Sequence, residues 1–128
     1  MKHNILIVDD SAMARMFIQR CFEIAGWQDA SFFQAGNGRE ALEMLKDKAV
    51  DLVLSDLNMP EMTGEELLVS IKESKELASI PVIIITSLSN TAKREQLLKW
   101  GASAVMPKPV SPASLAEALE LVFGEADD

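Results

Sequence analysis

The chain has 128 residues, which is the size of one domain, and we predict a single domain over residues 1–128. Hydrophobic residues make up 48% and charged residues 25% of the sequence, as in ordinary globular proteins, and no apolar run is long enough to cross a membrane. The net charge of -8 argues against nucleic-acid binding, and the single cysteine, Cys21, excludes an internal disulfide. We therefore expect a cytoplasmic monomer that binds neither membranes nor nucleic acids.

The first predicted elements are a buried strand and an amphipathic helix. Ile5–Val8 is apolar at every position, which predicts a strand buried on both faces. Ser11 is a typical N-cap, so a helix should run from there to about Ala25 and end at Gly26. Four apolar residues recur at helical spacing and predict the apolar face of this helix: Met13, Phe17, Cys21 and Ile24.

The middle of the chain repeats this alternation with shorter elements. A weaker strand is expected near Ser31–Gln34, followed by a short helix over Arg39–Lys46. Leu52–Leu54 predicts a third strand. The segment TGEE, which begins at Thr63, has the spacing of a capping box, so a helix should begin there and run to about Glu73.

Two further strands are predicted, over Val82–Ile85 and Ala104–Met106. Between them a polar helix should span about Thr91–Trp100 and end at Gly101. Residues 125–128 should be frayed. The last helix is predicted from an N-cap, a proline at the first position and a closing glycine, which are Ser111, Pro112 and Gly124.

Alternation of five strands with five helices predicts the α/β class, as a doubly wound parallel sheet covered by helices on both faces. In open sheets of this kind, ligands bind beyond the carboxyl ends of the strands. The residues that directly follow the strands are therefore the candidates for a functional site. They are Asp9 and Asp10, Asp56 and Asn58, Thr86 and Ser87, and Lys108 with Pro109.

Three carboxylates collected at one edge would repel each other unless a cation lies among them. Only oxygen ligands are available there, and such a set with open positions suits Mg²⁺. A lysine and a hydroxyl beside that metal would stabilise the oxygens of a phosphoryl group. The sequence thus predicts a metal beside a carboxylate that becomes phosphorylated.

Each of these residues also has a purely structural interpretation. Asp9 and Asp10 could cap the first helix, because acids favour a helix N-terminus. Asp56 could form a turn, and the hydroxyls of Thr86 and Ser87 could lie unused in a loop. Lys108 between two prolines is harder to explain in this way, because lysine is usually a solvated side chain.

The segments VDDS, SDLNMPEMTG, ITS and PKP occur in this order at the four strand ends. Together they resemble the receiver domain of bacterial two-component response regulators, in its single-domain CheY-like form. The resemblance covers residues 4–123. It implies a flavodoxin-like sheet of order 2-1-3-4-5.

The resemblance also implies roles for individual residues. Asp56 would accept a phosphoryl group from the phosphohistidine of a histidine kinase, which is the expected phosphodonor. Asp10 and Asp56 would bind Mg²⁺ through their side chains, Asn58 through its backbone carbonyl and Asp9 through water. Thr86 would contact the bound phosphoryl group.

Lys108 would pair with the phosphoryl group, and the Lys108-Pro109 bond would be the cis peptide of the family. His3 is expected to be an exposed terminal residue, so the phosphoryl donor must be another protein.

Two positions depart from the family pattern. Val105 replaces the aromatic residue or histidine that many relatives carry, which puts a ring-rotation switch in doubt. Leu88 replaces an acid or amide near the hydrolytic water, which predicts slow self-dephosphorylation. With the aromatic switch removed, the loop from Thr86 to Asn90 becomes the expected moving part. The resemblance places the output on the face of the fourth helix, fifth strand and fifth helix.

We therefore predict a chemotaxis-type receiver in two-component signal transduction that switches the binding of a downstream target protein. It would not be a conventional enzyme, although it would catalyse its own phosphotransfer and slow hydrolysis of the aspartyl phosphate. A phosphorelay intermediate, which passes the phosphoryl group to a second histidine protein, is the alternative within this fold. A phosphatase or phosphotransferase that acts on small molecules, and an inert scaffold, are competing functions of different classes.

Overall fold

Parallel strands form the centre of the protein. The computed structural model describes residues 3–87 and 90–124. Within these residues, five strands pair in the order β2-β1-β3-β4-β5. The predicted parallel sheet and its order are confirmed. The strands are β1 (Asn4–Val8), β2 (Ser31–Ala35), β3 (Leu52–Asp56), β4 (Val82–Thr86) and β5 (Ala104–Pro107).

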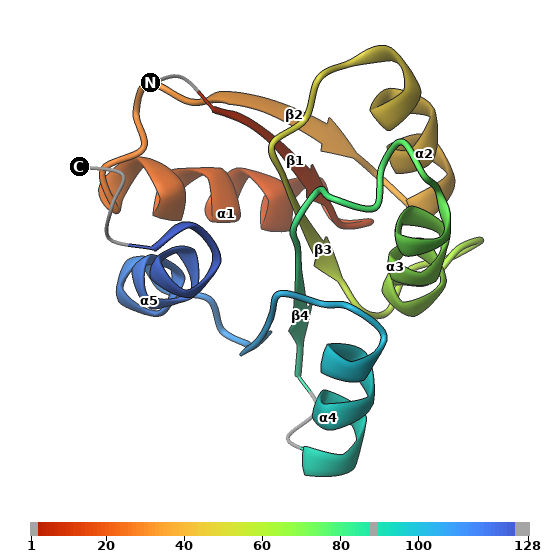
Figure 1. Ribbon diagram of the computed structural model, residues 1–128. Helices are drawn as coiled ribbons and strands as arrows, with labels where there is room; N and C mark the ends of the chain where they lie inside the picture. The colour runs from red at the N-terminus through yellow and green to blue at the C-terminus, as the bar shows by residue number, and fades with distance from the viewer. Residues whose placement is uncertain (1–2, 88–89, 125–128) are drawn as a thin grey trace.

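Helices cover both faces of this sheet, as Figure 1 shows, with α1 and α5 on one side and α2, α3 and α4 on the other. Five helices are present in the described part of the chain, so the doubly wound architecture is also confirmed. The helices are α1 (Ala12–Ile24), α2 (Gly38–Asp47), α3 (Gly64–Glu73), α4 (Thr91–Lys99) and α5 (Pro112–Phe123).

The core consists of two layers, one on each face of the sheet. Alternate residues of β1 enter different layers, because successive side chains of a strand point to opposite faces. Leu6 packs in the layer beneath α2, α3 and α4, whereas Ile5 and Ile7 pack in the layer beneath α1 and α5. All residues of β3 and β4 are buried, which explains why both strands begin with apolar runs, Leu52–Leu54 and Val82–Ile85, that lack polar alternation.

The predicted helix caps are present. The Ser11 hydroxyl accepts a hydrogen bond from the Ala14 amide at 3.2 Å, which fixes the start of α1. Thr63 and Glu66 form the reciprocal bonds of a capping box, with the Thr63 amide donating to Glu66 Oε1 at 2.9 Å. Ser111 caps α5 in the same manner. These caps set where each helix begins relative to the strand before it.

One prediction about α1 is wrong. Of the four residues expected on its apolar face, only Cys21 is buried, whereas Met13 and Phe17 are 80% and 53% exposed and Ile24 is also exposed. The buried side chains are those of Ile18, Cys21 and Phe22. Their spacing is also helical, so the sequence contains two overlapping apolar stripes, and packing on the sheet selects this one. The stripe of Met13 and Phe17 therefore stays on the surface.

His3 is not an exposed terminal residue. It is half-buried, and its ring centroid lies 4.8 Å from that of Trp27 and 5.3 Å from that of Phe123. These rings pack at the start of β1, because the end of α1 and the end of α5 converge there. The cluster thus lies at the amino end of β1, whereas Asp9 lies at its carboxyl end, six residues or about 20 Å further along the strand direction.

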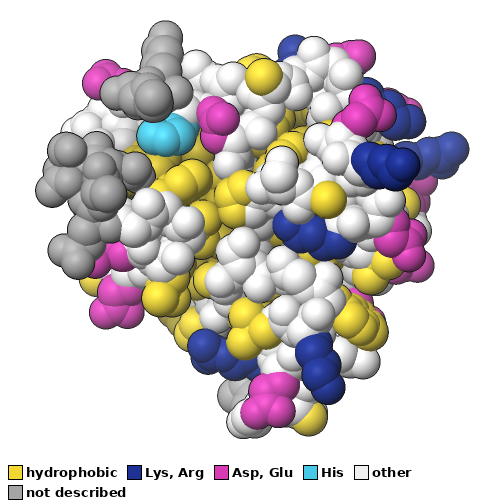
Figure 2. All heavy atoms as spheres, viewed as in Figure 1, with side chains coloured by type: hydrophobic (Ala, Val, Ile, Leu, Met, Phe, Trp, Pro, Cys, Tyr) yellow, Lys and Arg dark blue, Asp and Glu magenta, His cyan; other side chains and the backbone are white. Residues whose placement is uncertain are grey.

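Hydrophobic side chains reach the surface between the two helical layers in Figure 2, and the charged side chains lie mostly toward the rim. Among the described residues, no helix is both long and apolar enough to cross a membrane.

Gly64 fixes how closely α3 approaches the end of β3. A Cβ atom at Gly64 would collide with the carbonyl oxygen of Asp56 and would lie 3.0 Å from Leu57 Cα. Only glycine permits this approach without a shift of the backbone. The first turn of α3 is therefore packed directly against the residue that ends β3.

Replacement of Gly64 by alanine should lower the free energy of unfolding by about 1–3 kcal/mol, since backbone rather than a flexible side chain must move. Gly36→Ala is the matched control, because its nearest new contacts would be side-chain atoms at 3.6 Å or more. That control should stay within about 1 kcal/mol of the parent protein. Urea unfolding measures both variants, and equal midpoints for Gly64→Ala and the parent would show that the contact imposes no constraint.

Candidate functional site

The register of the sheet brings the predicted site residues together. Val8 pairs with Ser55, so Asp9 lies beside Asp56 at the ends of β1 and β3. Asp56 pairs with Ile85, and Thr86 pairs with Pro107, so Lys108 follows directly beyond β5. Strand β4 ends one residue later than predicted, at Thr86, and β3 ends two residues later, at Asp56. Both residues therefore belong to strands rather than to the loops that follow.

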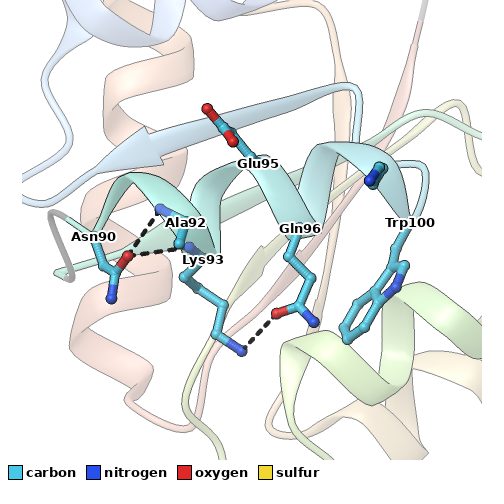
Figure 3. A pocket seen from close by; sticks show the side chains of 7 residues that line it. Asn90, Ala92, Lys93, Glu95, Gln96 and Trp100 are labelled. Atoms are coloured by element: carbon cyan, nitrogen blue, oxygen red, sulfur yellow. Dashed lines mark hydrogen bonds between the residues drawn. The ribbon is translucent and has the colours of Figure 1, made fainter.

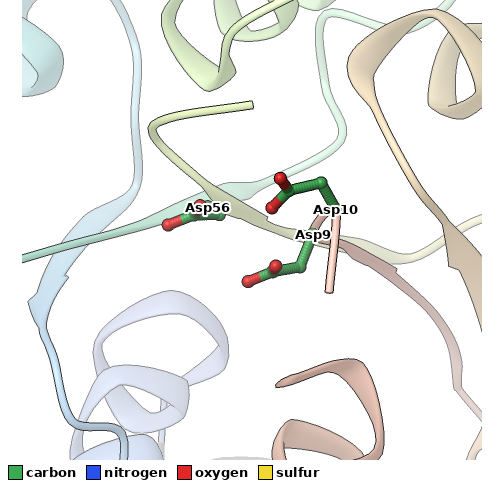
Figure 4. A group of neighbouring side chains, drawn as sticks. All are labelled: Asp9, Asp10 and Asp56. Atoms are coloured by element: carbon green, nitrogen blue, oxygen red, sulfur yellow. The ribbon is translucent and has the colours of Figure 1, made fainter. Parts of the chain in front are cut away.

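Three carboxylates form the centre of the site. Figure 4 shows Asp9 and Asp10 from the end of β1 beside Asp56 from the end of β3, and one oxygen of each lies within 4.8 Å of the others. Asp9 and Asp56 are only 3% and 5% exposed, whereas Asp10 is exposed. Two nearly buried carboxylates and one solvent-facing carboxylate thus share a small volume.

The electrostatics of Asp9 reflect this crowding. Burial raises the pKa of the Asp9 carboxyl, and the nearby charges of Asp56 and Asp10 raise it further. Two interactions act in the opposite direction and lower the pKa of Asp9. They are a hydrogen bond from the Ser11 amide to Asp9 Oδ1 at 2.9 Å and the positive charge of Lys108. Negative charge at this position is therefore costly without a compensating cation.

Lys108 supplies part of that compensation. Its Nζ lies 2.8 Å from Asp56 Oδ1. The hydrogen bond to Asp56 raises the pKa of the Lys108 ammonium group, against a smaller opposing effect of burial. The Lys108 amide also donates to the Thr86 carbonyl oxygen at 3.0 Å, and the Lys108-Pro109 bond is cis as predicted. Lys108 is thus bound to the ends of β3 and β4 at once.

The remaining predicted residues surround this centre. Thr86 is buried at the end of β4, and Ser87 is exposed directly after it. Asn58 is exposed two residues beyond Asp56. Val105 is buried in the core layer beneath α4 rather than at the site itself. The structure therefore brings the three acids, Lys108 and the strand end at Thr86 together, but places Val105 in the core.

Sequence reasoning missed the residues that hold the end of β1. Arg15 Nη1 donates to the carbonyl oxygen of Asp9, and Arg15 Nε donates to Gln34 Oε1 at 2.9 Å. Gln34 in turn donates to Gln19 Oε1 at 3.3 Å. These bonds fasten β1, β2 and α1 to one another beside the acids. No motif in the sequence signals them, since they depend on which strands are neighbours.

The loop after β3 is fixed in a similar way. Glu61 has a φ of 65°, a left-handed conformation that is uncommon outside glycine. Its carboxylate accepts a hydrogen bond from Asn37 Nδ2 at 3.3 Å and lies 3.8 Å from Arg39 Nη1. The loop that follows Asp56 is thereby tied to the start of α2.

Helix α4 forms a separate surface beyond the site. Asn90 Oδ1 accepts hydrogen bonds from the amides of Ala92 and Lys93, which caps α4, as Figure 3 shows. Lys93 Nζ also pairs with Glu65 of α3 at 2.7 Å. The groove along this helix has a volume of about 660 Å³ and is lined by Asn90, Ala92, Lys93, Glu95, Gln96, Lys99 and Trp100. All of these residues belong to α4 or directly flank it, and none belongs to β5 or α5.

Comparison with known proteins agrees with this geometry. The family model of the response regulator receiver domain matches residues 5–120. The chain belongs to this family. Chemotaxis protein CheY-3 of Vibrio cholerae is 37% identical over 123 residues, which cover 94% of this chain and 91% of the relative. Chemotaxis protein CheY1 of Helicobacter pylori is 35% identical over 125 residues, which cover 97% and 99%.

Similarity extends to a relative named for a process other than chemotaxis. The polar-differentiation response regulator DivK of Brucella anthropi is 29% identical over 126 residues, covering 98% of this chain and 100% of the relative. Among solved structures, the chemotaxis response regulator CheY4 of Vibrio cholerae superposes with a TM-score of 0.85 at 28% identity, covering 96% of this chain and 100% of that one. The flavodoxin-like receiver fold predicted from the sequence is thus confirmed.

Proposed function

We propose that this receiver domain is a phosphorylation-dependent binding switch of a two-component system. Asp56 receives a phosphoryl group from the phosphohistidine of a histidine kinase, and the phosphorylated protein changes its affinity for a target protein. The observation that carries this proposal is the pairing of the buried Asp56 carboxylate with Lys108 at 2.8 Å, next to two further carboxylates. Similarity to chemotaxis proteins supports a chemotaxis-type regulator.

In this mechanism Asp56 is the nucleophile. One of its carboxylate oxygens attacks phosphorus, the phosphorus–nitrogen bond breaks, and its electron pair leaves with the imidazole nitrogen. Lys108 carries a positive charge, as lysine ordinarily does near neutral pH, and its hydrogen bond to Asp56 raises its pKa further. Its ammonium group can then donate hydrogen bonds to the phosphoryl oxygens. These oxygens carry the negative charge once the Asp56 carboxylate has become an acyl phosphate.

Mg²⁺ is the proposed cofactor. The donor set fits a hard divalent cation, because all three side chains offer carboxylate oxygens within 4.8 Å of one another. Asp10 and Asp56 would bind Mg²⁺ directly, Asp9 through water, and Asn58 through its backbone carbonyl. When bound, Mg²⁺ neutralises carboxylate and phosphoryl charge during the transfer.

The signal leaves through the surface of α4, β5 and α5. The Thr86 hydroxyl moves toward the phosphoryl group, and the start of α4 follows. The protein catalyses the transfer of a phosphoryl group to its own Asp56 and the slow hydrolysis of the aspartyl phosphate. It turns over no separate substrate, so it is not a conventional enzyme. We propose a cytoplasmic location, as expected for a receiver of the CheY-like form.

Phosphorylation of Asp56 is the first prediction of this proposal. Incubation with Mg²⁺ and a candidate histidine kinase that has been phosphorylated on histidine should give one acid-stable, base-labile acyl phosphate, located by mass spectrometry. Asp56→Asn should give none, because the amide is not a competent nucleophile. Transfer of label to Ser55 or Ser87 in that variant would contradict the assignment. Onward transfer to a second histidine protein would instead identify a phosphorelay intermediate.

Binding of Mg²⁺ should be weak, reversible and dependent on Asp10. Asp10→Ala should weaken binding by more than about tenfold, since even outer-shell partners of metal ligands contribute about 10–100-fold. Asp29→Ala removes the same charge from an exposed position in the loop between α1 and β2, away from the strand ends, and should leave binding unchanged. Isothermal titration calorimetry measures the Mg²⁺ affinity of both variants. Equal weakening in the two would show that the loss of one negative charge, and not the loss of a metal ligand, causes the effect.

The switch should depend on Thr86 and not on Val105. Trp100 ends α4 and is 38% exposed, so its fluorescence can report a shift of that helix in a Trp27→Phe background. Beryllium fluoride serves as the phosphoryl mimic. Thr86→Ala should remove most of the change in Trp100 fluorescence that beryllium fluoride causes. Val105→Ala should change the coupling free energy between the phosphoryl mimic and the position of α4 by less than about 1 kcal/mol. A response lost in Val105→Ala but kept in Thr86→Ala would reverse these roles.

Leu88, from which the sequence predicts slow dephosphorylation, lies outside the described residues. This remains a prediction from the sequence. Leu88→Gln should speed decay of the acyl phosphate in the presence of Mg²⁺, and unchanged or slower decay would contradict it.

A further inference from the structure

One arginine holds the peptide that links Asp9 to Asp10. Arg15 lies near the start of α1, and its Nη1 donates a hydrogen bond to the carbonyl oxygen of Asp9. This carbonyl belongs to the peptide group between the two acids, so the bond fixes the orientation of the plane that contains both Cα atoms. A single donor therefore acts on the placement of two of the three carboxylates in the acidic site.

The guanidinium group of Arg15 is itself fixed from a second side. Its Nε donates to Gln34 Oε1 on β2 at 2.9 Å, and Gln34 Nε2 donates to Gln19 Oε1 on α1 at 3.3 Å. A guanidinium presents its donors in one rigid plane, so the contact with Gln34 orients the nitrogen that reaches Asp9. Arg15 and both glutamines are half-buried, which limits the competition of water for these bonds.

The two acids differ in how firmly their other contacts hold them. Asp9 is nearly buried, its amide donates to the Ala35 carbonyl at 3.1 Å, and its Oδ1 accepts from the Ser11 amide at 2.9 Å. Asp10 is exposed, so packing does not confine its side chain, and its placement depends on the backbone that carries it. Arg15 binds that backbone directly ahead of the Asp10 Cα atom.

We propose that Arg15 is a positioning residue that makes the acidic site selective for Mg²⁺ over Ca²⁺. This inference rests on the proposed Mg²⁺ site. Mg²⁺ requires near-ideal octahedral geometry with ligands at about 2.0–2.1 Å, whereas Ca²⁺ accepts more ligands at about 2.3–2.6 Å in flexible arrangements. Carboxylates on a fixed peptide therefore favour the smaller ion. Carboxylates that can shift lose affinity for Mg²⁺ more than for Ca²⁺.

The positive charge of Arg15 does not by itself produce such selectivity. Mg²⁺ and Ca²⁺ carry the same charge, so a nearby cation repels both ions to nearly the same extent. The ratio of the two affinities removes this contribution and reports on the geometry of the ligands. A change in the stability of the fold also cancels in the ratio, because both ions bind the same folded protein.

The test measures the affinities of the whole protein for Mg²⁺ and for Ca²⁺ at equal ionic strength, by nuclear magnetic resonance titration of amide resonances near the acids. Arg15→Lys keeps the charge but has no rigid fork that reaches the Asp9 carbonyl and Gln34 together. It should lower the Mg²⁺ affinity by about tenfold and the Ca²⁺ affinity by less than about threefold. The ratio of Mg²⁺ to Ca²⁺ affinity should therefore fall by at least about threefold.

A second variant and a matched control accompany Arg15→Lys. Gln34→Ala removes the second bond of the guanidinium and leaves Arg15 in place. It should lower the affinity ratio by a smaller factor, and it carries the test if Arg15→Lys does not fold. Arg20→Ala is the control, because Arg20 lies on the same helix with a side chain that is 71% exposed and pairs with Glu23. This control should keep the parent ratio.

An unchanged ratio in both Arg15→Lys and Gln34→Ala would overturn the proposal, as would an equal fall in Arg20→Ala. If Arg15→Lys lowers the affinities for both ions by the same factor, Arg15 supports binding in general without selecting Mg²⁺, and the proposal is also wrong.

Failure of the proposed Mg²⁺ site is a separate outcome. If the parent protein binds neither ion, or if Asp10→Ala binds Mg²⁺ as tightly as the parent does, the proposed site is wrong and the inference about Arg15 falls with it. If the parent binds Mg²⁺ through Asp10 but the Arg15 and Gln34 variants keep the ratio, only the inference about Arg15 fails.

Discussion

Burial of two carboxylates at neighbouring strand ends is the constraint on which the rest of the site depends. Unit charges 4.8 Å apart repel by roughly 3 kcal/mol at an effective dielectric constant of about 20, and Asp9 and Asp56 lie within that distance. The ammonium group of Lys108 and the amide of Ser11 offset part of this cost. The arrangement can persist because the paired residues of β1 and β3 are fully buried and hold the two strands in register, which prevents the acids from moving apart.

The same contacts connect the acids to the surface where a signal would leave. Lys108 is bound to Asp56 through its side chain and to the Thr86 carbonyl through its amide. A change of charge at Asp56 therefore acts on the ends of β3, β4 and β5 together. Helix α4 begins shortly after β4 and is fastened to α3 by the pair of Lys93 and Glu65. Any movement of α4 has to break or carry along that ion pair.

Helix α1 has two functions in this arrangement. Its inner face closes one core layer, and Arg15 holds the end of β1 in place. Its outer face leaves Met13 and Phe17 exposed. Exposed large apolar side chains that lie close together are a cost to solubility.

The sequence by itself determined the strands, the helix caps, the sheet order through family resemblance, and which polar residues follow the strand ends. It could do so because apolar runs, capping residues and strand-end positions are local signals. It did not determine which of two overlapping stripes on α1 is buried, nor that His3 packs against Trp27, nor that Arg15 holds Asp9. Those features depend on which segments become neighbours when the sheet forms, and only the tertiary structure decides that, because packing of distant segments overrides equivalent local patterns.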